Sequence, residues 1–319
     1  MTLGRSGPAS PGRAFSATAR CACRPSPPGT IWPRLSRRAA LGLGAAAAGT
    51  GLIGLDLALG ARSRPAGALI DGIVWQVHGG ALDPRGDWDY IGARSLLVQW
   101  LVAEGTAFVP LPKLGLKLIP DAPNWKRIAR EPWASQIIAG LAGDFSEPRA
   151  RANVVELGAL SAKVAQQKLP FRPAGFYFPV EADPTWKDVA RMREALAPIP
   201  RPLWVSCYDN SNVGPEALAD WIELWLPRDV GLFFQDGCGV YTRAPGAARR
   251  YAEVISQRLG ARRFKIIAEA FRPSGGGSFR AATAAELLPQ LKAYEGFDVF
   301  VFDGPHYVDR LIVQQLLAG

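Results

Sequence analysis

The sequence predicts an α/β fold, a single (β/α)8 barrel over residues 66–319, preceded by a basic export leader over residues 1–65. Two observations support the barrel. Short apolar runs rich in Ile, Val, Phe, Trp and Tyr alternate with amphipathic helical patterns, and Gly, Pro, Asp or Asn bound the runs, as for buried parallel strands. Eight such runs lie within about 250 residues, which is the usual size of this barrel.

The expected strands are, in order, Ile70–His78, Ser95–Trp100, Ser135–Ala142, Ala174–Val180, Pro202–Tyr208, Val230–Gln235, Phe264–Ala268 and Phe297–Phe302. The clearest helical patterns between and after them are Ala152–Gln167, Trp186–Ala197, Pro215–Leu226, Gly246–Leu259, Ala284–Tyr294 and Tyr307–Leu317.

Glycine and proline mark several expected helix boundaries. Asp183-Pro184 and Gly214-Pro215 are helix starts, and Gly260 stands where a helix should end. The first two connections are weaker, because residues 85–94 allow only a short helix and residues 109–126 are mainly loop. A doubly wound open sheet is the alternative fold, but no Gly-x-Gly-x-x-Gly follows the first strand.

The net charge of +9 lies almost entirely in the leader. Residues 1–65 hold nine Arg and one acid, Asp56, whereas residues 66–319 hold 28 basic and 27 acidic residues. Nucleic-acid binding needs a basic face on the folded domain, so the near-neutral barrel argues against a nucleic-acid partner.

The leader has the order of an export signal. Arg37 and Arg38 precede a weakly apolar run, Gly42–Ala61, and small residues follow it. The paired arginines, with Leu41 three positions after the second, resemble a twin-arginine leader, although Ala40 stands where Phe is usual. The expected location is outside the cytoplasm, periplasmic or extracellular. An uncleaved membrane anchor, which would be the only membrane contact, and a transit peptide are the alternatives.

The active site of such a barrel lies at the carboxyl ends of the strands, and polar residues gather there. They are Gln76, His78, Gln99, Trp100, Asp144, Glu181, Asp183, Tyr208, Asp209, Asn210, Gln235, Asp236, Glu269, Asp303 and His306. Asp183, ahead of a proline, is expected to be a helix cap.

Two of these residues, Glu181 and Glu269, directly continue apolar strands. Glutamate is a poor strand residue and is rarely buried without a partner, so two at equivalent positions need a cause. Alternation places Glu181 on the face of Tyr177 and Glu269 on the face of Ile267. If those faces point inward, the carboxyls meet at the barrel mouth as glycoside cleavage requires, and a separation of roughly 5–5.5 Å would indicate retention.

Aromatic residues at strand ends fit a sugar ligand, because the flat apolar faces of sugar rings stack on aromatic rings. Trp100 and Tyr208 are the best placed of them. The other candidate substrate-binding residues are Gln99, Tyr177, Asn210, Gln235, Asp236 and Asp303. No cofactor is expected.

Four runs in strands two, four, six and seven carry a resemblance: Leu97-Val98-Gln99-Trp100, Gly175-Phe176-Tyr177-Phe178-Pro179-Val180-Glu181-Ala182-Asp183, Gln235-Asp236-Gly237-Cys238-Gly239 and Ala268-Glu269-Ala270-Phe271. In this order they resemble a glycoside-hydrolase-like (β/α)8 domain family of bacterial exported proteins, described largely as a domain of unknown function. The resemblance would cover the chain from about residue 70 to its end.

More broadly, a Glu after strand four and another after strand seven is similar to the large clan of retaining (β/α)8 glycosidases. That resemblance implies that Glu181 is the acid/base and Glu269 the nucleophile. Val180 stands where the clan usually has Asn, which removes the usual contact to the sugar 2-hydroxyl.

The expected function is therefore a glycoside hydrolase that acts on a poly- or oligosaccharide by the retaining two-carboxylate mechanism. The main alternative is a non-catalytic carbohydrate-binding or polysaccharide-assembly protein on the same barrel. In a second alternative both glutamates form ion pairs, with Lys265, Arg272 or a neighbour.

A metal enzyme is a third alternative, because His78 and His306 end strands one and eight and Asp303 could join them. Two histidines make a thin ligand set, so no metal is expected. Cys207 and Cys238 follow adjacent strand ends, and we hypothesise a disulfide between them.

Overall fold

The computed structural model describes residues 67–319, so the predicted leader lies outside the described residues. In the described part of the chain no helix is both long enough and apolar enough to cross a membrane.

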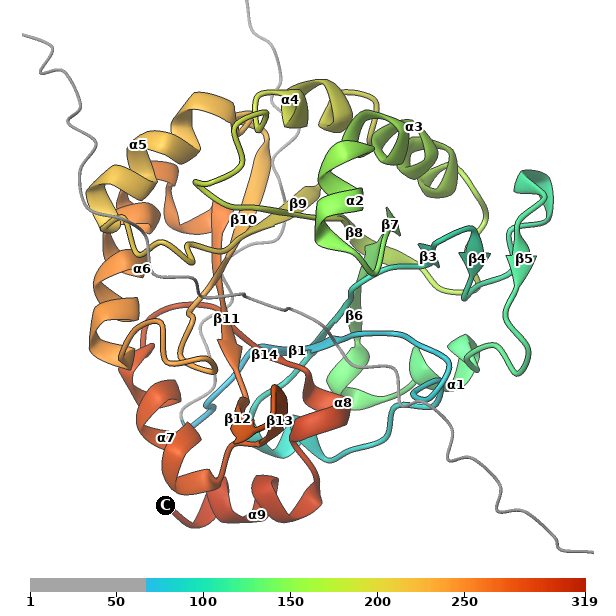
Figure 1. Ribbon diagram of the computed structural model, residues 1–319. Coiled ribbons are helices and arrows are strands. Elements are labelled where there is room, and N and C mark those ends of the chain that lie inside the picture. The colour runs from blue at the N-terminus through green and yellow to red at the C-terminus, as the bar shows by residue number, and fades with distance from the viewer. Residues whose placement is uncertain (1–66) are drawn as a thin grey trace, which may run out of the picture. The chain divides into compact units, whose positions relative to one another are not determined.

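Eight parallel strands close into a barrel in which the last strand pairs with the first (Figure 1). They are β1 (Gly72–Trp75), β2 (Ser95–Val98), β6 (Gln136–Gly140), β8 (Pro173–Ala182), β9 (Leu203–Cys207), β10 (Val230–Gln235), β11 (Phe264–Glu269) and β14 (Val299–Phe302). Each predicted run overlaps one of these strands, so the predicted fold class is confirmed and the open sheet is excluded.

Helices lie around the outside of the barrel (Figure 1). The α-helices are α1 (Trp125–Ile128), α2 (Glu147–Ala152), α3 (Val154–Ala165), α4 (Arg191–Leu196), α5 (Pro215–Trp225), α6 (Pro245–Leu259), α7 (Ala284–Ala293), α8 (Gly304–Tyr307) and α9 (Arg310–Ala318). Short 3-10 helices span Trp88–Ile91, Pro112–Leu114, Pro132–Ala134 and Ala261–Arg263. As predicted, the first two connections hold only short helical segments.

The predicted helix start at Asp183 is wrong. α4 begins at Arg191. Asp183 Oδ1 accepts a hydrogen bond from Thr185 N at 2.8 Å, and its Oδ2 accepts one from Asn210 N at 3.1 Å. Asp183 therefore ties the end of β8 to the loop after β9.

A layer of apolar side chains closes the barrel interior below the mouth, and we call it the barrel floor. Every strand contributes one inward-facing residue to it. The members are Val74, Leu97, Ile138, Tyr177, Trp204, Phe233, Ile267 and Phe300. Because side chains alternate along a strand, the next inward-facing residues line the mouth above this floor.

Two small sheets extend the carboxyl ends of the strands. β12 (Phe271–Gly275) and β13 (Ser278–Ala281) form a hairpin directly after β11. The strands β3 (Val102–Ala103), β4 (Thr106–Ala107), β5 (Lys117–Leu118) and β7 (Ala142–Gly143) form a second sheet in the order β5-β4-β3-β7.

Candidate active site

Glu181 and Glu269 lie at the carboxyl ends of β8 and β11, on the inner face of the barrel. Glu181 shares its face with Tyr177 of the barrel floor, and Glu269 shares its face with Ile267. Glu269 is 5% exposed, and Glu181 is partly exposed. The negative charge of Glu181 contributes to raising the pKa of Glu269.

The Glu269 carboxyl and its backbone are held by separate groups. Oε2 accepts a hydrogen bond from Gly239 N at 2.7 Å, and Glu269 N donates to Asp236 Oδ1 at 3.2 Å. Asp236 is fully buried, and its Oδ2 accepts from Gln290 Nε2 at 2.5 Å and from Tyr294 OH at 2.8 Å. Asp236 thus fixes the strand end, while Gly239 orients the carboxyl.

Glu181 is held from two sides. Gln235 Nε2, from the end of β10, donates a hydrogen bond to Glu181 Oε2. On the other side, Glu147 Oε1 accepts a hydrogen bond from Glu181 N at 2.9 Å. Arg151 Nε donates to Glu181 O at 3.1 Å, so both the side chain and the backbone of Glu181 are fixed.

Both carboxyls hold their protons more tightly than in water. Burial raises the pKa of Glu181 to about 7, with a smaller raising contribution from Asp183. Burial, and then the charge of Asp236, raises the pKa of Glu269 to about 8. Two such carboxyls near neutral pH can supply one protonated and one ionised group, as general acid catalysis beside a nucleophile requires.

Arginines close to the pair bind main-chain oxygens at the strand ends. The carbonyl oxygens of Glu181, Gln235 and Glu269 each accept a hydrogen bond from one arginine. The contacts are Arg151 Nε to Glu181 O at 3.1 Å, Arg243 Nη1 to Gln235 O at 3.4 Å and Arg272 Nη1 to Glu269 O at 3.1 Å. We call these three residues the carbonyl-binding arginines.

Lys265 and Arg272, the ion-pair partners considered for the two glutamates, contact other groups. Lys265 forms its ion pair with Asp298, and Arg272 also donates to Gln290 Oε1 at 2.7 Å. The guanidinium of Arg272 contacts the backbone of Glu269, not its carboxylate.

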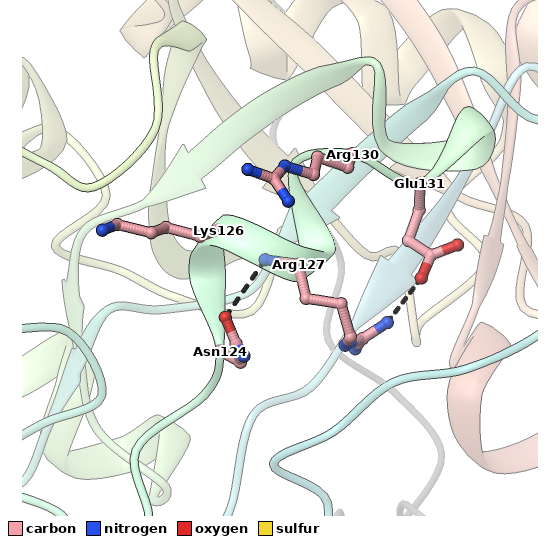
Figure 2. A pocket seen from close by; sticks show the side chains of 5 residues that line it. All are labelled: Asn124, Lys126, Arg127, Arg130 and Glu131. Carbon is pink, nitrogen blue, oxygen red and sulfur yellow. Dashed lines mark hydrogen bonds and ion pairs between the residues drawn. The ribbon is translucent and has the colours of Figure 1, made fainter.

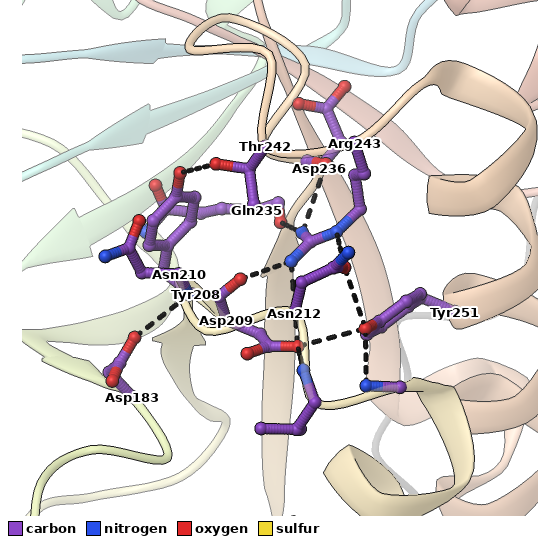
Figure 3. A network of polar contacts seen from close by, with 12 residues as sticks. Asp183, Tyr208, Asp209, Asn210, Asn212, Gln235, Asp236, Thr242, Arg243 and Tyr251 are labelled. Carbon is purple, nitrogen blue, oxygen red and sulfur yellow. Dashed lines mark hydrogen bonds and ion pairs between the residues drawn. The ribbon is translucent and has the colours of Figure 1, made fainter. Parts of the chain in front are cut away.

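Arg243 is the centre of the polar network shown in Figure 3. It is 5% exposed, its Nε donates to Asn212 Oδ1 at 3.2 Å, and it forms an ion pair with Asp209 at 3.7 Å. Its guanidinium lies 4.6 Å from the ring centroid of Tyr251. This network joins the loop after β9 to the loop after β10.

Tyr208 is the predicted aromatic residue that the structure places beside the carboxyl pair. Its hydroxyl is 3.0 Å from Thr242 Oγ1, and it is partly exposed (Figure 3). Burial raises the pKa of this hydroxyl, and the charges of Glu269 and Glu181 add to the effect. Asn210 is exposed on the same loop.

Three predicted substrate-binding residues lie behind the mouth. Trp100 is 3% exposed and its Nε1 donates to Val77 O at 2.7 Å. Tyr177 belongs to the barrel floor and donates to Ser206 Oγ at 2.7 Å. The Asp236 carboxylate accepts hydrogen bonds from Glu269 N, Gln290 and Tyr294. Their side chains are paired inside the protein, because these strand-end positions also pack the core.

Two other predicted residues, Gln99 and Asp303, each have a buried side-chain oxygen without a hydrogen-bond partner in the described part of the protein. These oxygens are Gln99 Oε1 and Asp303 Oδ1. Burial raises the pKa of Asp303 well above its ordinary value, against a smaller lowering by a hydrogen bond from the backbone of Gln76.

His78 and His306 follow β1 and β14, which pair with each other in the closed barrel. Burial, and then the neighbouring His306, lowers the pKa of His78. Within residues 67–319, no group of three His, Cys, Asp or Glu side chains is arranged to hold a metal ion.

The hypothesised disulfide between Cys207 and Cys238 is not formed. Both cysteines are free and buried. Cys207 packs in the outer apolar core, whereas Cys238 Sγ lies 3.4 Å from Tyr294 OH. Neighbouring strand ends therefore do not bring these two thiols together.

Comparison with known proteins agrees with the barrel. The chain resembles a solved structure described as a "putative alpha-L-fucosidase" from Bacteroides thetaiotaomicron VPI-5482. The match has 15% identity, covers 79% of this chain and 94% of that chain, and has a TM-score of 0.53. At this identity the match shows a shared fold. No protein-family model and no curated protein matches the sequence.

Three residues of the site were not predicted from the sequence: Glu147, Arg151 and Gly239. Glu147 and Arg151 are an i,i+4 pair of opposite charge, which is a recognisable pattern on a helix, but α2 is short and precedes the stretch predicted as helical. Gly239 lies inside one of the runs that carry the resemblance, but nothing in its spacing indicates a contact with Glu269.

A shallow surface pocket around α1 contains none of the predicted site residues. Figure 2 shows the side chains that line it. They are Asn124, Lys126, Arg127, Arg130 and Glu131. Arg127 and Glu131 form an ion pair at 2.6 Å, so part of its charge is neutralised locally.

Proposed function

We propose that the protein is a retaining glycoside hydrolase in which Glu181 is the acid/base and Glu269 the nucleophile. The observation that supports the proposal is that Glu181 and Glu269 end two strands of one barrel and that both carboxyls receive hydrogen bonds from the same region, Glu181 from Gln235 at the end of β10 and Glu269 from Gly239 N in the loop after it. The first step needs Glu181 protonated and Glu269 ionised, whereas in the free protein Glu269 has the higher pKa, so the assignment of roles rests on the positions of the two residues on β8 and β11 and not on the order of their pKa values.

In the first step, the ionised Glu269 attacks the anomeric carbon and forms an ester while the bond to the leaving oxygen breaks. Glu181 gives its proton to that oxygen, which leaves as an alcohol. In the second step, Glu181 removes a proton from water, the water oxygen bonds to the anomeric carbon, and the ester to Glu269 breaks. The hydrogen bond from Gly239 N stabilises the ionised Glu269 before attack.

We propose an uncharged poly- or oligosaccharide as the substrate, encountered outside the cytoplasm. Carboxyls gather at the mouth, and each carbonyl-binding arginine donates to a main-chain oxygen. A uronate or sulfate group would meet the ionised member of the carboxyl pair, and these guanidinium groups are already engaged at the strand ends. The amide of Gln235 and the hydroxyl of Tyr208, both partly exposed, match sugar hydroxyls in donors and acceptors.

The second candidate is a sugar-binding barrel without catalysis. Val180 favours it, because this residue stands where the resemblance implies Asn and is fully buried in the outer core. Such a residue offers no amide to the sugar 2-hydroxyl.

The deciding experiment measures hydrolysis of a panel of bacterial and plant polysaccharides by the wild type, Glu181→Gln and Glu269→Gln, with Glu156→Gln on the exposed face of α3 as the control. We expect both site variants to lose activity and the control to keep it. Binding without hydrolysis by the wild type would support the sugar-binding candidate instead.

Chemical rescue then separates the two roles. Azide added to Glu269→Ala with an activated glycoside should yield a glycosyl azide of inverted configuration, because azide takes the nucleophile's place. Azide added to Glu181→Ala should yield the retained configuration, because it attacks the covalent intermediate. The opposite pairing of products would reverse the assigned roles.

A further inference from the structure

The backbone of Glu181 lies in an interruption of strand pairing. β8 pairs with β6 only as far as Tyr177, and its pairing with β9 shifts register between Phe178 and Ala182. The intervening residues form a bulge, which is a common way to redirect a side chain next to an active site. A bulge at this position leaves backbone polar groups that need other partners.

One turn of α2 supplies those partners at Glu181. Glu147 Oε1 accepts from Glu181 N at 2.9 Å, and Arg151 Nε donates to Glu181 O at 3.1 Å. The same two side chains pair with each other at 3.2 Å. The Arg151 guanidinium also lies 5.7 Å from the ring centroid of Trp186, which holds it from another side. Glu147 and Arg151 therefore supply the hydrogen bonds that strand pairing does not give to the N–H and C=O groups of Glu181.

Glu147 also brings a third carboxyl next to the proposed catalytic pair. Burial, and then the charge of Glu181, raises the pKa of Glu147, while Arg151 lowers it. Arg151 also lowers the pKa of Glu181. Of the pair, Arg151 is thus the member whose charge acts on the Glu181 proton, and it favours the loss of that proton.

We propose that Glu147 and Arg151 are positioning residues for Glu181: their hydrogen bonds to its backbone hold the β8 bulge so that its carboxyl faces Glu269. This inference rests on the proposed function, because it assigns a use to the orientation of the Glu181 carboxyl. Neither residue is required to touch the substrate.

The test is a titration of the purified protein labelled with 13C at the glutamate side-chain carboxyls, with Glu181→Gln identifying the Glu181 signal. We expect Arg151→Gln to raise the midpoint of the Glu181 titration by about 1 pH unit, because it removes a positive charge. Glu147→Ala removes the acceptor for Glu181 N and should lower kcat more than it raises KM. Glu156→Gln on α3 is the matched control and should leave both the midpoint and kcat in place. A moved midpoint together with a selective loss of kcat distinguishes positioning from a general loss of folding.

A second pair of variants keeps the test decisive if a neutral substitution unfolds the chain. Glu147→Asp keeps the charge but withdraws the oxygen from Glu181 N, and Arg151→Lys keeps the charge but loses the fixed donor geometry. Both should keep the Glu181 midpoint within about 0.5 pH units of wild type while lowering kcat more than they raise KM. A Glu181 midpoint that stays in place when the Arg151 charge is removed would overturn the proposal.

The titration needs no substrate, so its failure is separable from failure of the proposed function. Hydrolysis that depends on Glu181, together with an unmoved midpoint in Arg151→Gln and an unchanged kcat in Glu147→Ala, would reject these positioning residues and keep the glycosidase. A shifted midpoint in a protein that hydrolyses nothing would reject the glycosidase, and with it the use of the Glu181 orientation, while the contacts to the bulge remain.

Discussion

Gly239 N donates to Glu269 Oε2 at 2.7 Å, and a Cβ built on Gly239 would lie 2.8 Å from that same oxygen. It would also lie 2.7 Å from Glu269 Cβ, which is closer than real Cβ atoms approach. We therefore expect Gly239→Ala to push the Glu269 carboxyl out of place. A misplacement of a catalytic group by about 1 Å costs on the order of 100-fold in kcat/KM. Steady-state kinetics on the hydrolysed substrate would measure the loss.

The control for this variant is Gly246→Ala. Gly246 lies in α6, and a Cβ added to it would have no heavy atom within 4 Å, so alanine should fit without displacement. Alanine is also the better helix former by about 1 kcal/mol, so the melting temperature should hold or rise. Full activity in Gly239→Ala, with the fold intact, would remove Gly239 from the site.

The raised pKa values of Glu181 and Glu269 predict that stability falls as pH rises. Each carboxyl has an ordinary value of 4.5 and a folded-state pKa of about 7 or about 8, so the folded state binds more protons within that interval. The unfolding free energy should therefore decrease between pH 4.5 and about 8. Urea denaturation across this range would measure it, and Glu269→Gln should show a shallower slope than the wild type. An equal slope in the variant would contradict burial of an ionisable Glu269.

Substrate charge gives a further prediction. We expect an uncharged polysaccharide to be bound at least about tenfold more tightly than the same polymer after its primary hydroxyls are oxidised to carboxylates, a difference of about 1.4 kcal/mol. Affinity electrophoresis of matched neutral and oxidised polymers would measure it, at low and high salt. Equal or tighter binding of the oxidised polymer at low salt would contradict an uncharged substrate.

Export by the twin-arginine route can be tested on the leader itself. Replacing Arg37 and Arg38 with Lys keeps the charge but removes the arginine pair, so the full chain should accumulate in the cytoplasm of a bacterial host. Arg34→Lys, upstream of the pair, is the matched control and should be exported like the wild type. Cell fractionation with N-terminal sequencing of the exported form would read both location and cleavage.

Strand periodicity was sufficient to predict the barrel, because short apolar runs and their Gly and Pro boundaries are local signals. The inward placement of Glu181 and Glu269 followed from the same alternation. Trp100 and Asp236 show where such reasoning ends: residue type and strand position do not reveal whether a side chain faces the mouth or is paired behind it. Glu147 was missed because its role arises from a bulge in β8, and a loss of strand pairing leaves no pattern in the residues themselves.

The carbonyl-binding arginines donate to backbone oxygens, so these hydrogen bonds do not depend on the side chain of the residue that carries the oxygen. A substitution at Glu181, Gln235 or Glu269 changes the chemistry displayed at the mouth but leaves each guanidinium its acceptor. Evolution and protein engineers can therefore exchange the reactive groups of this barrel while its supporting frame stays the same. New activities can arise here by changing single side chains at the ends of strands that are already anchored.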